Sequence, residues 1–156
     1  MSDRLIAITL DDTGLPAPTP EMTQERQVAI FDLLEENSFT LPDTTVTGPY
    51  ALTLSVQDRR LVFDIANEAG APVTNFHLSL TPFKRIIKDY SVICESYFDA
   101  VKHLGPAQIE ALDEGRRDIH GEGARVLQER LAAHTTIDLP TARRLFTLVC
   151  VLQSPT

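Results

Sequence analysis

The sequence has 156 residues, which fits one domain with a substantial hydrophobic core. Its contents of 43% hydrophobic and 23% charged residues are those of an ordinary globular protein and exclude a disordered chain. The formal net charge of -8 opposes non-specific binding to nucleic acid, so we expect no nucleic-acid partner.

The first predicted elements are a strand at residues 4–10 and a helix at about 20–36. Apolar and polar residues alternate loosely in the first segment. Thr19 and Pro20 form a helix start, with a capping hydroxyl followed by a proline in the first turn. Apolar residues cover several sides of this helix and predict that most of it is buried: Met22, Val28, Ala29, Ile30, Phe31, Leu33 and Leu34.

Three strand-like runs follow, at residues 50–57, 60–67 and 73–80. Each alternates apolar and polar side chains, and short polar segments connect them. This pattern predicts an antiparallel meander with one face exposed to water. Together with residues 4–10, the meander is expected to form a four-stranded sheet.

Two helices are then predicted to pair. In residues 81–105, Thr81 is the expected cap and Pro82 the first helical residue. Apolar side chains recur every three or four positions through that helix: Phe83, Ile86, Ile87, Tyr90, Ile93, Cys94, Tyr97, Val101 and Leu104. The next helix begins at once and runs over about 106–131, so the two form an antiparallel hairpin.

The last predicted helix, over about 139–152, is apolar nearly all round. Periodicity alone leaves open whether residues 145–152 are helix or buried strand. We therefore expect one α+β domain over residues 1–156, with the element order β-α-β-β-β-α-α-α. An antiparallel sheet of about four strands would carry the helical hairpin and the C-terminal helix on one face. The hairpin or the last helix is also expected to form a homodimer contact.

Six motifs spread over nearly the whole chain resemble the alphaproteobacterial uncharacterised protein family 0262: IFDLLEENSF (30–39), LVFDI (61–65), LSLTPFKRIIKDY (78–90), ICESYFDAV (93–101), PAQIEALDEGRRDIHGEG (106–123) and TARRLFTLVCVL (141–152). That family has no assigned activity, so the resemblance implies no catalytic residue. Its pattern has an asparagine where this chain has Gly121, which argues against a role for an amide beside His120.

The stretch EGRRDIHGEG (114–123) carries the main candidate site residues. At 100° per residue, Arg116 and His120 fall on the inward apolar face of the helix and Arg117 at its flank. A buried charge costs several kcal/mol unless it is paired. Asp113 can pair with either arginine along the helix.

Two interpretations of these side chains stay open. In the structural one, Arg116 binds a carboxylate of another element, such as Glu35, Glu36 or Asp99, and His120 bonds a carbonyl. In the functional one, the arginine pair binds a phosphate or carboxylate, with His120 as the candidate catalytic acid, base or phosphoryl acceptor.

Two glycines follow this histidine, and each costs a helix about 1 kcal/mol relative to alanine. Gly121 and Gly123 therefore predict either a break in the helix or the close approach of another backbone, as in a dimer seam. Glu122 between them is a further candidate supporting acid.

Other pairs of basic residues stand at Arg59-Arg60, Lys84-Arg85 and Arg143-Arg144. Cations at the start of a helix oppose its dipole, so Lys84 and Arg85 are additional anion-binding candidates. Solvated surfaces account for most such pairs.

Metal, cofactor and membrane signals are missing from the sequence. The four histidines lack metal-ligand spacing, no phosphate-binding or dinucleotide motif occurs, and neither a metal nor a cofactor is expected. Cys94 and Cys150 lie in apolar runs and are expected to be reduced and buried. No run is apolar for long enough to span a membrane, and the N-terminus lacks a signal peptide, so we expect a cytoplasmic protein.

The sequence favours a non-enzymatic regulatory or adaptor protein of the bacterial cytosol that binds another protein. The alternative is an enzyme or sensor that binds a small anionic metabolite through Arg116, Arg117 and His120. A deep pocket containing these residues and acids from another element would favour the metabolite, whereas a flat apolar patch would favour a protein partner.

Overall fold

The computed structural model describes residues 3–13, 19–42 and 47–153. Its elements follow the predicted order: β1 (Leu5–Leu10), α1 (Pro20–Glu35), β2 (Tyr50–Gln57), β3 (Arg60–Asn67), β4 (Pro72–Ser79), the short 3-10 helix η1 (Thr81–Phe83), α2 (Lys84–His103), α3 (Pro106–Leu131) and α4 (Leu139–Gln153).

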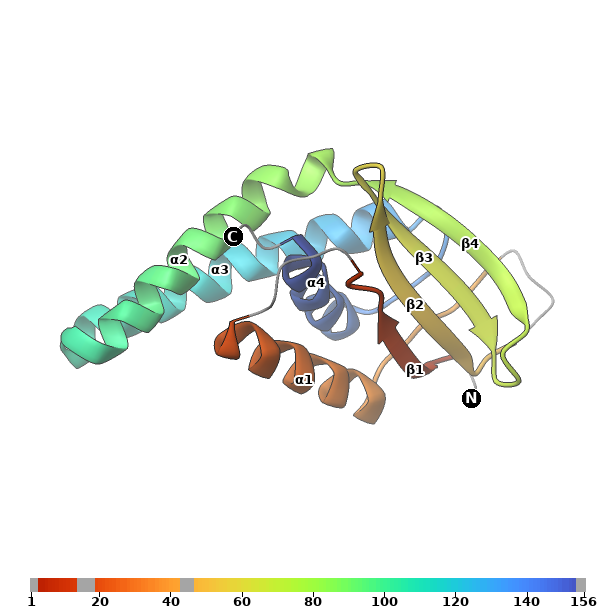
Figure 1. The fold of residues 1–156 in the computed structure, drawn as a ribbon, viewed down its shortest axis with the longest axis horizontal. Helices are drawn as coiled ribbons and strands as arrows, with labels where there is room; N and C mark the ends of the chain where they lie inside the picture. Colours follow the sequence, from red (N-terminus) through yellow and green to blue (C-terminus); the bar gives the residue numbers. More distant parts are fainter. Residues whose placement is uncertain (1–2, 14–18, 43–46, 154–156) are drawn as a thin grey trace.

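The four strands form one sheet in the order β1-β2-β3-β4, and the predicted α+β class is confirmed (Figure 1). The sheet is mixed rather than purely antiparallel, because β1 runs parallel to β2. The helix α1 separates these two strands and returns the chain to the same end of the sheet, as a crossover between parallel strands requires. The meander is antiparallel as expected, and its first turn has positive φ at Asp58 (51°) and Arg59 (62°), typical of a two-residue hairpin.

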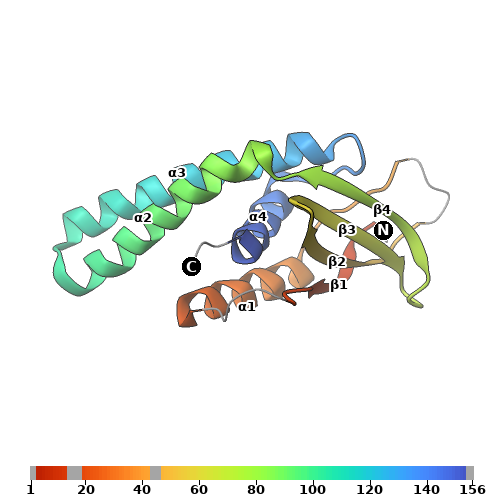
Figure 2. The ribbon, with the colours of Figure 1, turned by 45° about the horizontal axis from the view of Figure 1, so that its top comes forward.

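The four helices lie beside the sheet, and α4 occupies the centre of the arrangement. In both ribbon views α4 lies between α1 and the antiparallel pair α2–α3 (Figures 1 and 2). Residues 145–152 are helical, which answers the question that the sequence left open. Asp138 accepts a hydrogen bond from the backbone of Thr141 (2.9 Å) and so caps the start of α4.

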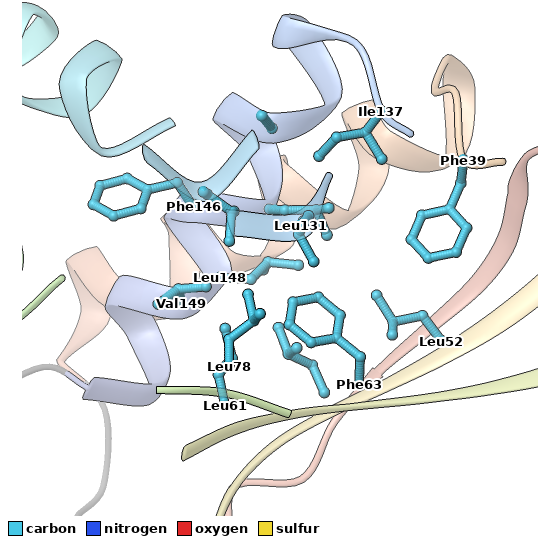
Figure 3. Close-up of a cluster of buried hydrophobic side chains, with 14 of the residues drawn as sticks. Phe39, Leu52, Leu61, Phe63, Leu78, Leu131, Ile137, Phe146, Leu148 and Val149 are labelled. Atoms are coloured by element: carbon cyan, nitrogen blue, oxygen red, sulfur yellow. The ribbon is translucent and has the colours of Figure 1, made fainter. Parts of the chain in front are cut away.

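The core lies between the sheet and these helices. Figure 3 shows Leu61 and Phe63 of β3 and Leu78 of β4 facing Leu148 and Val149 of α4. All five are at least nine-tenths buried. The alternating strand residues thus form one wall of the core and α4 forms the opposite wall.

Two helices are less buried than the sequence predicted. In α1 only Ala29 and Leu33 are fully buried, whereas Val28 and Phe31 are 51% and 63% exposed, because only one narrow side of α1 contacts α4 and β1. At the end of α2, Leu104 and Val101 are also exposed, because the hairpin projects beyond the core (Figure 1).

Of the two predicted helix caps, Thr19 and Thr81, the structure confirms only the first. The hydroxyl of Thr19 accepts the predicted hydrogen bond from the backbone of Met22 (3.1 Å). The predicted cap Thr81 instead begins the 3-10 turn, so α2 starts at Lys84 without a side-chain cap. Within the described ranges, no helix is both long and apolar enough to cross a membrane.

Candidate functional site

A groove runs between α1 and the hairpin, with α4 as its floor. It consists of two adjoining cavities of about 400 Å³ and about 660 Å³. We call the smaller one the arginine lobe, because Arg116, Arg143 and Arg144 line it together with His120. We call the larger one the acidic lobe, and its lining includes Glu21, Glu25, Glu95, Asp99, Lys102, Cys94 and Cys150. Both lobes share Glu21, Glu25, Tyr90 and Phe98, so they meet there.

The Arg116 guanidinium is held in place inside the arginine lobe. Its Nη2 donates to Asp113 Oδ1 at 2.6 Å, and its Cζ lies 4.5 Å from the centre of the Tyr97 ring. Its Nε is buried without a hydrogen-bond partner among the described residues. Arg117 also reaches Asp113 (3.2 Å), but its side chain is 67% exposed. The predicted inward Arg116 and flanking Arg117 are therefore confirmed, and the partner of both is Asp113 rather than Glu35, Glu36 or Asp99.

His120 is held by two rings and a hydroxyl. Its ring centre lies 5.2 Å from that of Tyr90 and 5.3 Å from that of Phe146. Its Nε2 lies 2.7 Å from Thr147 Oγ1, which can donate its own proton to the carbonyl of Arg143 at 3.3 Å. When the threonine proton goes to that carbonyl, the hydroxyl oxygen accepts from Nε2–H and Nδ1 is an acceptor; when it goes to Nε2, Nδ1 carries the ring proton. The sequence interpretation expected a carbonyl as the partner of His120, and the structure has this threonine instead.

The imidazole is neutral at physiological pH. Burial, reinforced by the positive charges of Arg143 and Arg116, lowers the pKa of His120 to about 4. A neutral imidazole can donate and accept hydrogen bonds, and it adds no charge to the lobe.

The two arginines of α4 are free to bind. Within the described part of the chain, neither Arg143 nor Arg144 makes an ion pair or a hydrogen bond through its guanidinium. The pair stood in the sequence as an ordinary solvated dibasic pair. Sequence periodicity did not identify it as part of the site because its relation to His120 depends on how α4 crosses α3.

Glu25 is a site residue that sequence reasoning missed. It lies in the middle of α1, where the two lobes meet, and is only partly exposed. Burial raises the pKa of its carboxyl, while the charge of Arg116 across the groove acts in the opposite direction. No ion pair joins Glu25 to a described cation. An acid on an amphipathic helix resembles any surface acid in the sequence, so no local signal marked it.

The acidic lobe has an apolar wall that contains both thiols. Cys94 is buried, Cys150 is partly buried, and both line this lobe with Ile87 and Val151. Burial raises the pKa of Cys94 to about 11, and burial also raises the pKa of Cys150. Thiols with such pKa values are protonated at neutral pH and behave as small apolar groups.

We expect Cys94 in the native protein to react with iodoacetamide about a hundredfold more slowly at pH 8 than in the unfolded chain, because little thiolate is present. Mass spectrometry of timed samples measures the two rates. Equal rates in native protein and in guanidinium would contradict the burial of this thiol.

Of the two glycines that follow His120 in α3, only Gly123 marks a close approach, and it is the approach of a ring and not of a backbone. The helix continues through them without a break. A Cβ on Gly123 would overlap the Phe146 ring, whereas a Cβ on Gly121 would be 3.6 Å from the Arg125 side chain. Position 123 therefore has no room for a side chain, because a ring of α4 in the same chain packs directly on α3 there. A dimer seam is not needed to explain this glycine.

Several sequence candidates lie outside the groove. Lys84 and Arg85 are exposed in the first turn of α2, and Arg85 contacts Asp89 at 3.8 Å. Glu122 is exposed and lines neither lobe. Among the described residues, no three His, Cys, Asp or Glu side chains form a group that could hold a metal ion.

Comparison with known proteins identifies relatives but no activity. The model of the uncharacterised protein family UPF0262 matches residues 2–154. A UPF0262 protein of Paracoccus denitrificans (strain Pd 1222) is 60% identical over 97% of this chain and 96% of its own. One of Jannaschia sp. (strain CCS1) is 64% identical over 93% of this chain and 94% of its own. No solved structure matches the chain.

Proposed function

The chain belongs to the uncharacterised protein family UPF0262, and we propose from its own groove that it is a non-enzymatic regulatory protein of the bacterial cytosol that binds a small anion. The ligand would carry a phosphate or a carboxylate. It would bind in the arginine lobe, with Arg143 and Arg144 as its charged partners and His120 as a neutral hydrogen-bonding partner.

One observation carries this proposal: two guanidinium groups without partners among the described residues share a cavity of about 400 Å³ with Arg116 and His120. Guanidinium groups bind carboxylates and phosphates through paired hydrogen bonds. The sequence put a protein partner first and a small anion second. We put the small anion first, because the cavity contains Arg116 and His120, though not the predicted Arg117, together with acids from another helix, α1.

The state of the titratable groups supports binding rather than chemistry. Nε2 of His120 is bonded to Thr147, and no described carboxylate is bonded to the ring to strengthen it as a base. Cys94 is protonated and buried. We therefore favour binding over nucleophilic catalysis at the arginine lobe.

The experiment titrates inorganic phosphate and, separately, butyrate into the protein while the ring signals of His120 are followed by NMR. Bound anion should raise the pKa of His120 above about 4, because it offsets the positive charges of the arginines. Arg143→Gln should weaken binding about tenfold or more, since it removes a hydrogen bond to a charged group.

Arg85→Gln is the matched control, because it removes the same charge from an exposed site on α2 outside the groove. It should leave binding unchanged. Equal weakening by the two substitutions would show general charge attraction instead of a site. An unchanged His120 signal in saturating phosphate and butyrate would refute the proposal.

The homodimer and the protein partner stay predictions. The exposed Val28 and Phe31 on α1 are apolar side chains that a partner chain would cover. Measuring the mass of the purified protein in solution tests the dimer directly.

A further inference from the structure

Charge is distributed unequally along the groove. All three arginines of the groove line the arginine lobe at one end, together with Asp32 and with Glu21 and Glu25, which both lobes share. The acidic lobe at the other end is lined by four carboxylates, from Glu21, Glu25, Glu95 and Asp99, and by the single amine of Lys102. A ligand that spans both lobes meets the three guanidinium groups at one end, and at the other end four carboxylates with a single amine.

Glu25 is the carboxylate best placed to bind a ligand at the junction of the lobes. It is partly buried and faces Arg116 across the groove without an ion pair, since Arg116 is already bonded to Asp113. A charge held away from water is costly unless it is paired. Within the described residues this carboxylate has no such partner, and a positive group of a ligand would supply one.

The wall between the two charged ends is apolar. Ile87, Cys94 and Cys150 line the acidic lobe beside Tyr90, which both lobes share. Methylene groups of a ligand can pack against this wall in any orientation, because apolar contacts are not directional. The groove therefore suits a molecule with charged ends and a short apolar middle.

We propose that the ligand of the groove is a small zwitterion, whose carboxylate or phosphate binds Arg143 and Arg144 and whose ammonium group binds Glu25. This inference rests on the proposed function, because it assumes that the arginine lobe binds an anion. It adds the second charged group of the ligand, and so excludes simple anions as the preferred class.

The test compares matched probes by NMR titration: unbranched ω-amino carboxylates from 3-aminopropanoate to 8-aminooctanoate, the alkanoates of the same lengths, and the corresponding alkylamines. At the best chain length, the amino carboxylate should bind about fivefold or more tightly than its alkanoate. Glu25→Gln should abolish this advantage without weakening alkanoate binding, because it removes a negative charge that also lines the arginine lobe. Arg143→Gln should weaken both classes.

Glu35→Gln is the matched control, because it removes an acid from the exposed last turn of the same helix outside both lobes. It should preserve the advantage of the amino carboxylates. If alkanoates and amino carboxylates bind equally well at every length, the zwitterion proposal is wrong while anion binding stands. If neither class nor phosphate binds, the proposed function fails, and this inference fails with it.

Discussion

Gly123→Ala is expected to lower the free energy of unfolding by about 1 to 3 kcal/mol, because the new methyl group would overlap a packed ring. A Cβ at this position lies 2.6 Å from Cε1 of Phe146, and that ring is completely buried. The rings of Tyr90 and His120 pack edge-on against it, with centroids 6.3 Å and 5.3 Å away, and limit how far it can move. Either α3 must shift away from α4 or the ring must leave its rotamer.

Gly121→Ala is the matched substitution two residues earlier in the same helix. Its Cβ would meet only side-chain atoms of Arg125 and Arg143, at 3.6 Å and 3.8 Å, which is ordinary contact. Alanine also favours a helix by about 1 kcal/mol relative to glycine. This variant should be as stable as the wild type or more stable.

Thermal unfolding separates the two glycine variants, since 1 kcal/mol corresponds to about 2 to 4 °C in Tm for a chain of this size. Gly123→Ala should melt several degrees below the wild type and Gly121→Ala at or above it. Equal destabilisation of both variants would mean that the two glycines are needed for the conformation of the helix backbone, and that the overlap with Phe146 is not the cause.

The second large effect is a loss of stability in mild acid that comes from His120. Its pKa in the folded protein is about 4, below the ordinary 6.5. As the pH falls from 6.5 to 4, the unfolded chain binds a proton at this residue while the folded protein does not. The free energy of unfolding should therefore fall by up to about 3 kcal/mol across this window and then level off.

Urea unfolding of the wild type and of His120→Gln between pH 7 and pH 4 isolates this contribution. The variant should lose stability less steeply, because glutamine binds no proton in this range. His77→Gln removes a histidine from the exposed side of β4 and is the control for loss of any histidine. If His120→Gln and the wild type lose stability in parallel, the buried neutral imidazole is not the cause.

The protonation of His120 and ligand binding are linked. An anion beside Arg143 would stabilise the protonated imidazole, so bound ligand should reduce the loss of stability in acid. If the groove binds an anion as proposed, it determines both the pH response and the ligand response. In the free protein, the neutral ring adds no charge to the lobe, so its positive charge comes from the arginines.

The sequence by itself determined the α+β class, the element order and the inward phase of Arg116 and His120. These features depend on local periodicity and capping, because a period of two or of 3.6 residues decides which side of an element faces the core. The pairing with Asp113 was also predictable, since residues three and four apart on a helix are neighbours.

Only the tertiary structure decided the rest. The parallel pairing of β1 depends on how α1 returns the chain, and the helical state of residues 145–152 depends on packing against α1 and α3. The groove joins Glu25 of α1 to Arg143 of α4, more than a hundred residues apart in the chain. No local pattern records such a juxtaposition, because it follows from the way helices cross and not from the spacing within any one of them.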